Sequence, residues 1–183
     1  MSFQFTDITH DWTLFLDRDG VINIEKKEDY IRKWVEFEFY KESLEALPIL
    51  ANKFKSIVIV TNQKGIGKGL MTHEDLAFIH QNMVDKISEV GGRIDHIFYC
   101  PDLDNNAPNR KPQPGMAFQA KQQFPHIKLE ESIMVGNRTS DMNFGRNAGL
   151  NTVFLATTHP ETTYPNPIID YRFDNLLTFA KSL

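Results

Sequence analysis

The chain has 183 residues, and 20 lysines and arginines stand against 24 aspartates and glutamates, a formal net charge of −4 at pH 7. This length suits one domain with a substantial core, and the mildly acidic balance argues against nucleic acid or an anionic membrane surface as a partner. No apolar run is long enough to span a membrane, the first residues do not resemble a signal peptide, and the single cysteine allows no intramolecular disulfide. We expect a cytoplasmic, monomeric protein.

The N-terminal third begins with an expected loose leader at residues 1–11 and a short buried strand at 12–15. Segment 21–39 mixes charged and aromatic side chains, and Val35–Phe39 alternates as a half-buried strand does. We interpret it as a mobile hairpin or loop that leans over a pocket; the alternative is that its aromatic side chains only pack on the sheet. A helix follows over 44–54, and Pro48 inside its pattern predicts a kink or a late start.

The rest of the chain alternates strand and helix patterns. Further strands are predicted at 56–61, 94–100, 132–136, 151–156 and 168–173. Helices are predicted at 72–90, 115–124, 139–148 and 175–181, with Thr72 as an N-cap. This alternation predicts an α/β fold with a doubly wound, Rossmann-like parallel sheet and helices on both faces. No connecting segment is long enough for a separate cap domain, so residues 1–183 are expected to form one domain.

Two aspartates follow the first strand, in the stretch Asp-Arg-Asp-Gly. Asp17 and Asp19 are two residues apart, so both can project into one pocket at the sheet edge where α/β proteins bind ligands. A divalent cation would relieve their repulsion. Asp17 would then be a usable nucleophile towards phosphorus, and Asp19 a proton shuttle. Taken alone, the stretch also fits a solvated turn.

Three later stretches follow the first one along the chain: Ile-Val-Thr-Asn-Gln at 59–63, Asn-Arg-Lys-Pro at 109–112 and Val-Gly-Asn-Arg-Thr-Ser-Asp at 135–141. With the first stretch they resemble the four motifs of the haloacid dehalogenase (HAD) phosphohydrolases, across residues 14–155. The match is greatest to the small capless branch that includes D-glycero-D-manno-heptose 1,7-bisphosphate and histidinol-phosphate phosphatases.

The resemblance implies a role for each motif residue. Asp17 would attack phosphorus and form an aspartyl phosphate, and Asp19 would protonate the leaving oxygen and then deprotonate the hydrolytic water. Thr61 would donate to the phosphate, and Lys111 would neutralise the phosphate and the nucleophile. Mg²⁺ would be bound by the Asp17 carboxylate, the Asp19 backbone carbonyl and the residue at position 137.

Position 137 departs from the family, because Asn137 replaces the metal-binding acid of the fourth motif. An amide oxygen can ligate a cation but brings no charge, so Mg²⁺ affinity is expected to fall. Asp141 is expected to lie just outside the metal's own ligands, or to compensate for the missing charge. The departure also motivates a competing hypothesis, a non-catalytic phosphosugar-binding protein.

The zinc loop of this branch is a second departure. Its pattern of cysteines and a histidine is reduced to Cys100 here, followed by Pro101-Asp102, and one ligand makes no tetrahedral site. We expect no zinc, and we expect Cys100 to be a buried residue at a strand end. The histidines form no ligand pattern, and His73 and His80 are assigned to a solvated helix face.

We therefore predict a Mg²⁺-dependent phosphomonoester hydrolase of a small phosphorylated sugar, with heptose 1,7-bisphosphate cut at the 7-phosphate as the leading substrate. Asn62, Gln63 and Arg110 are predicted to bind it, with 101–113 as a substrate loop. The alternative substrate is histidinol phosphate, whose cationic groups would need acids near the pocket. Segment 21–39 offers three: Glu25, Glu28 and Asp29.

Overall fold

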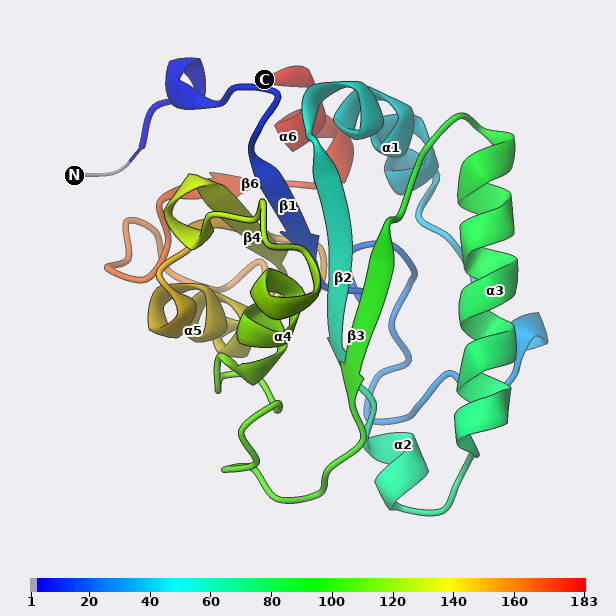
Figure 1. Ribbon diagram of the computed structural model, residues 1–183. Coiled ribbons are helices and arrows are strands. Elements are labelled where there is room, and N and C mark those ends of the chain that lie inside the picture. The colour runs from blue at the N-terminus through cyan, green and yellow to red at the C-terminus, as the bar shows by residue number, and fades with distance from the viewer. Residues whose placement is uncertain (1–2) are drawn as a thin grey trace.

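The computed structural model describes residues 3–183, in which six parallel strands form one sheet (Figure 1). The strands are β1 (Thr13–Leu16), β2 (Ser56–Asn62), β3 (His96–Cys100), β4 (Ser132–Gly136), β5 (Asn151–Leu155) and β6 (Tyr171–Phe173). Their order in the sheet is β3-β2-β1-β4-β5-β6. The predicted parallel α/β sheet is confirmed, although β3 and β6 begin two and three residues later than their patterns indicated.

Helices cover both faces of this sheet, as predicted. They are α1 (Lys41–Lys53), α2 (Lys64–Gly67), α3 (His73–Glu89), α4 (Gly115–Gln123), α5 (Thr139–Ala148) and α6 (Leu176–Lys181), with short 3₁₀ turns η1 (Phe5–Asp7), η2 (Trp34–Glu36) and η3 (Leu129–Glu131). Alternation in β1 explains the two layers: Leu14 and Leu16 pack in one core cluster with α1, α3 and α6, and Phe15 packs in the other with α4 and α5. Figure 1 shows α4 and α5 on the opposite side of the sheet from α3.

The strand order reverses its direction at β1, and this reversal positions the site. From β1 the chain moves outward to β2 and β3 on one side, then returns to β4 on the other. Leu16 pairs with Ile59 of β2 and Val135 of β4, so the carboxyl ends of these three strands lie together. Such a switch point is where open α/β sheets bind ligands.

The N-terminal segment is packed rather than loose over its described part. Phe3 and Ile8 are buried, and the ring of Phe5 lies 4.3 Å from that of Tyr171 on β6. The Tyr171 hydroxyl donates a 2.7 Å hydrogen bond to the Phe3 carbonyl. The prediction of a loose leader is therefore wrong from Phe3 onward, because its aromatic side chains cover the edge of the core; residues 1–2 lie outside the described part.

Helix α1 also differs from its prediction. It begins at Lys41, before the apolar pattern starts, and continues through Pro48 to Lys53. A proline inside a helix removes one hydrogen bond, but the fully buried Leu47 and Leu50 hold this helix on the sheet. Of the two expectations, a late start is therefore wrong, and a kink at Pro48 stays a prediction.

Segment 21–39 is an irregular loop closed at its base, not a hairpin with a strand at Val35–Phe39. The Ile24 N–H donates to the Glu38 carbonyl at 2.8 Å, and the Tyr40 N–H donates to the Ile22 carbonyl at 3.1 Å. Of the predicted strand, residues 35–36 lie in η2 and residues 37–38 have no regular structure; Phe37 is buried, and the centre of its ring lies 5.1 Å from that of Trp34. The aromatic alternation therefore reflects packing, which was the alternative for this segment.

Candidate active site

A cavity of about 510 Å³ opens at the carboxyl ends of β1 and β2, a size typical of small-molecule sites. Asp17, Asp19, Thr61 and Lys111, the four residues predicted to be catalytic, all line it. The predicted substrate residues Asn62, Gln63 and Arg110 line it as well, and so does Asp141. Residues 25, 26 and 28–31 form one wall, so segment 21–39 does lean over the pocket.

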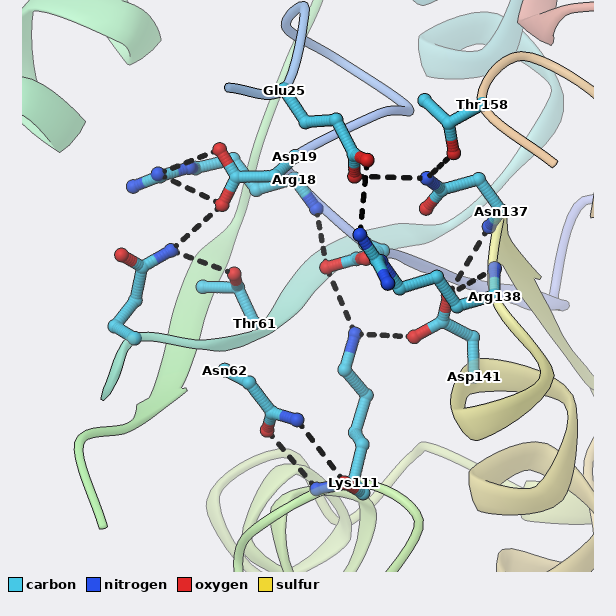
Figure 2. A network of polar contacts seen from close by, with 12 residues as sticks. Arg18, Asp19, Glu25, Thr61, Asn62, Lys111, Asn137, Arg138, Asp141 and Thr158 are labelled. Carbon is cyan, nitrogen blue, oxygen red and sulfur yellow. Dashed lines mark hydrogen bonds and ion pairs between the residues drawn. The ribbon is translucent and has the colours of Figure 1, made fainter. Parts of the chain in front are cut away.

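A buried ion cluster lies at the base of the cavity (Figure 2). Lys111 Nζ is 2.8 Å from Asp17 Oδ1 and 2.7 Å from Asp141 Oδ1, and all three side chains are at most 9% exposed. One ammonium thus faces two carboxylates. Burial raises the pKa of Asp17 to about 7; the Lys111 charge opposes this rise and the Asp141 charge adds to it. Burial would lower the pKa of Lys111, but the two carboxylates outweigh it and raise that pKa.

Asp19 is held by four donor contacts. Arg18 Nη2 lies 2.9 Å from both Asp19 carboxylate oxygens, and the side-chain amides of Asn23 and Gln63 each donate at 3.0 Å. Burial would raise the pKa of Asp19, but the Arg18 guanidinium and these amides outweigh it and hold that pKa below its ordinary value. The carboxyl group is therefore held as an anion.

Behind Asp19 lies a second layer that sequence reasoning missed. Arg18 is fully buried, and its Nη1 is 3.1 Å from His80 Nε2 on α3. Burial and the Arg18 charge lower the pKa of His80 to about 3, so this ring is neutral and its Nε2 accepts the hydrogen bond. The assignment of His80 to a solvated face is wrong. Its spacing from Leu76 and Met83 places it on the apolar stripe of α3, and this signal could have identified it.

The end of β2 contributes three polar side chains, which have different hydrogen-bond partners. Thr61 is buried, and its Oγ1 accepts a 3.0 Å hydrogen bond from Gln63 Nε2, which also donates to Asp19. Asn62 makes two 3.1 Å hydrogen bonds with the Lys111 backbone, one to its carbonyl and one from its N–H. Asn62 thereby fixes the loop that presents the lysine (Figure 2), and substrate binding by Asn62 and Gln63 stays a prediction.

Asn137 follows β4 and is fully buried beside the cavity. Its Nδ2 donates to Thr158 Oγ1 at 2.6 Å and lies 3.4 Å from Glu25 Oε2, whereas its Oδ1 is buried with no hydrogen-bond partner. A side chain at Gly20 would collide with this amide, because a Cβ there would lie 2.0 Å from Nδ2. The backbone can therefore approach Asn137 only at a glycine, whose φ here is +84°.

These residues fit a hard cation such as Mg²⁺. The unpartnered Asn137 Oδ1 and the Asp17 carboxylate are oxygen donors of the type that Mg²⁺ prefers. Within residues 3–183 no group of three or more His, Cys, Asp or Glu side chains is arranged around a metal, so a site here must use amide and backbone oxygens as well. Asp141 Oδ2 accepts hydrogen bonds from the backbone N–H groups of Asn137 and Arg138, at 3.1 and 2.9 Å, and so orders the turn after β4.

Four cationic side chains line the cavity besides Lys111, and one of them, Lys26, is paired with Glu36 at 3.0 Å. Arg138 is paired with Glu25 at 2.9 Å, Lys64 donates to Asn105 at 2.8 Å, and Arg110 lies 3.3 Å from the Asp102 carbonyl.

Cys100 is fully buried at the end of β3, as predicted. Across residues 3–183 no helix combines the length and apolarity needed to cross a bilayer.

Comparison with known proteins agrees with this geometry. The chain is 35% identical over 172 residues to the D-glycero-alpha-D-manno-heptose-1,7-bisphosphate 7-phosphatase of Mycobacterium bovis, covering 93% of this chain and 90% of the relative. It is 35% identical over 158 residues to a D-glycero-beta-D-manno-heptose-1,7-bisphosphate 7-phosphatase of Helicobacter pylori, covering 85% and 89%. The fold matches the crystal structure of a D,D-heptose 1,7-bisphosphate phosphatase from B. bronchiseptica, complexed with magnesium and phosphate. That match has a TM-score of 0.84 and 25% identity, and covers 93% of this chain and 97% of the other.

A family profile covers the same region. The profile described as polynucleotide kinase 3 phosphatase matches residues 8–161, which contain all four motifs and every residue of the ion cluster. The chain therefore belongs to this family of HAD phosphatases, in the branch of the heptose-bisphosphate phosphatases.

Proposed function

We propose that the protein is a Mg²⁺-dependent phosphatase that removes the 7-phosphate of D-glycero-D-manno-heptose 1,7-bisphosphate. The observation that carries this proposal is the buried Asp17–Lys111–Asp141 cluster at the base of a cavity that Asp19 also lines. Relatives at 35% identity are named for the same reaction, which supports the substrate. Because the names of these relatives include both anomers, either anomer is a candidate.

Asp17 is the proposed nucleophile. Lys111 Nζ and the Arg18 backbone N–H both contact its Oδ1, at 2.8 and 2.7 Å, so Oδ2 is the oxygen left to attack phosphorus. The attack forms an aspartyl phosphate as the bond between phosphorus and the sugar oxygen breaks. Lys111 offsets the negative charge of the incoming phosphate and opposes the rise in the pKa of Asp17, and the Thr61 hydroxyl would donate to a phosphate oxygen.

Asp19 is the proposed proton shuttle. The leaving sugar oxygen takes its proton in the first step, and water returns one as it hydrolyses the aspartyl phosphate. The four contacts described above keep Asp19 in the basic form, which the second step requires. A dianionic phosphate in the cavity raises the pKa of a neighbouring carboxyl group, so we expect substrate binding to favour the protonated form needed in the first step.

Mg²⁺ would be bound by three oxygen ligands: the Asp17 carboxylate, the Asp19 backbone carbonyl and Asn137 Oδ1. When bound, the ion supplies positive charge that offsets the charge developing on the transferred phosphoryl group. The B. bronchiseptica structure, which is titled as a complex with magnesium and phosphate, supports this choice of cation.

The outer cavity favours a bisphosphate over histidinol phosphate. Lys64 and Arg110, which contact only neutral acceptors, provide cations for a second phosphate in the cavity. Two of the acids that a cationic substrate would need are already paired: Glu25 with Arg138 at 2.9 Å, and Asp29 with Arg32 at 3.0 Å.

The test is phosphate release from heptose 1,7-bisphosphate, histidinol phosphate and a panel of sugar monophosphates across a Mg²⁺ titration, with Asp17→Asn as the control. We expect fastest release from the bisphosphate and none from the variant. Equal turnover of unrelated monophosphates would contradict the substrate. Binding of heptose bisphosphate without release, at any Mg²⁺ concentration, would instead support the phosphosugar-binding hypothesis that Asn137 motivates.

A further inference from the structure

The side-chain amide of Asn137 has two chemically different ends, and the structure assigns each a distinct surrounding. Nδ2 faces two acceptors, Thr158 Oγ1 at 2.6 Å and Glu25 Oε2 at 3.4 Å. Oδ1 is buried and has no hydrogen-bond partner. In Figure 2, Nδ2 points to Thr158 and Glu25, and Oδ1 points away from both.

This orientation decides whether Asn137 can bind a cation. An amide oxygen ligates a metal ion, but an NH₂ group is a donor only and would repel it. A carboxylate at this position would need no such control, since its two oxygens are equivalent. The replacement by asparagine therefore creates a requirement that the usual acid does not have, namely that something must hold the amide the right way round.

Glu25 meets that requirement, because an ionised carboxylate only accepts hydrogen bonds, and Thr158 Oγ1 anchors the same Nδ2 at 2.6 Å. A reversed amide would place its partially negative oxygen against the Glu25 carboxylate, so that two acceptors would face each other with no proton between them, and it would turn its NH₂ group towards the metal side. Glu25 is itself fixed, because its Oε1 is paired with Arg138 at 2.9 Å and only 16% of its side chain is exposed. The arrangement is thus a built contact between segment 21–39, the turn after β4 and the loop after β5.

We propose that Glu25 and Thr158 are positioning residues that orient Asn137 so that its Oδ1 serves as a ligand for Mg²⁺. This inference rests on the proposed Mg²⁺ dependence, and it adds two residues that the motifs do not contain. Neither residue touches the substrate in this role; both act through the amide. Outer partners that orient metal ligands typically contribute about 10- to 100-fold to affinity.

The test measures binding of Mg²⁺ alone, without substrate, by calorimetry and by the Mg²⁺ concentration that gives half-maximal thermal stabilisation. Thr158→Val removes the acceptor of the shorter of the two Nδ2 hydrogen bonds, while the side chain keeps its shape and the site keeps its charge. It should weaken Mg²⁺ binding at least about tenfold in the native background. In an Asn137→Asp background it should change binding less than about threefold, because a carboxylate needs no orientation. Glu25→Met should show the same dependence on background.

Two control variants match these substitutions: Thr163→Val, an exposed threonine in the same loop, and Glu38→Met, an exposed glutamate in segment 21–39. Neither should alter Mg²⁺ binding. Equal losses in both backgrounds, or no loss from either Thr158→Val or Glu25→Met, would overturn the inference while leaving Mg²⁺-dependent hydrolysis intact. Absence of Mg²⁺ binding by the unmutated protein would overturn both proposals.

Discussion

The ion cluster predicts that the proposed nucleophile costs the metal-free protein stability. Two buried carboxylates share Lys111, and the pKa of Asp17 rises from 3.8 to about 7. Between these values the folded state binds more protons than the unfolded state, so the cost of the ionised carboxylate grows as the pH rises and is complete above pH 7. At about 1.4 kcal/mol per pKa unit, the cost is up to about 4 kcal/mol at pH 8 and less than half of that at pH 5.

Asp17→Asn keeps the shape and an acceptor for Lys111 and removes the charge. In EDTA at pH 8, the variant should therefore unfold at a higher urea concentration and melt roughly 10 °C above the unmutated protein, while it releases no phosphate. At pH 5 most of this advantage should disappear, because the native Asp17 is then protonated. Saturating Mg²⁺ should narrow the gap at pH 8 by stabilising only the unmutated protein. A variant that is less stable at both pH values would refute this account of the cluster.

Three further substitutions test other contacts. Lys111→Met leaves two buried carboxylates without their shared cation and should cost about 3–5 kcal/mol in urea unfolding at pH 8. His80→Leu removes the buried acceptor of Arg18, at a cost of about 1–3 kcal/mol. It should also abolish a loss of stability as the pH falls from 6.5 towards 3, where only the unfolded His80 takes a proton. Gly20→Ala places a Cβ 2.0 Å from Asn137 Nδ2 on a backbone with φ of +84°, and phosphate release should be lost.

Each of these substitutions has an outcome that would contradict its basis. A Lys111→Met protein of native stability would mean that the two carboxylates are not both charged. If the pH dependence of unfolding is unchanged in His80→Leu, then His80 is not the group whose protonation destabilises the folded protein at low pH. Full activity in Gly20→Ala would show that the close approach of Asn137 is unimportant.

The location of the site could be predicted from the sequence because it follows from the sheet. Asp17, Thr61 and Asn137 stand at or just after the ends of β1, β2 and β4, and parallel strands bring their carboxyl ends together. The position of Lys111 could not be derived in this way, because it lies in the long loop between β3 and α4. Resemblance to the family motif predicted it, and two hydrogen bonds between the Asn62 side chain and the Lys111 backbone explain its placement.

The contact between Arg18 and His80 behind Asp19 could not be predicted from the sequence. Arg18 is next to Asp19 in the chain, but its other partner, His80, is 62 residues away on α3. A local pattern does not show which distant side chain will accept a hydrogen bond from a buried guanidinium. The helical spacing of His80 was the available signal, and it was overruled by the expectation that histidines face solvent.

Segment 21–39 shows the limit of periodicity more generally. Alternation at Val35–Phe39 predicted a strand, but a strand needs a partner edge, and only Phe39 makes a bridge, to Asn23. The aromatic side chains instead pack on one another and on the core. The same segment places Glu25 beside Asn137, a contact between residues 112 positions apart that no motif predicts.

The central claim is Asp17-dependent removal of the 7-phosphate, and phosphorus NMR of heptose 1,7-bisphosphate turnover tests it most directly. The account predicts that the signal of the 7-phosphate is replaced by that of inorganic phosphate in the presence of Mg²⁺. The signal of the 1-phosphate should persist, and Asp17→Asn should leave both signals unchanged. Loss of the 1-phosphate first, or turnover by the Asp17→Asn variant, would contradict it.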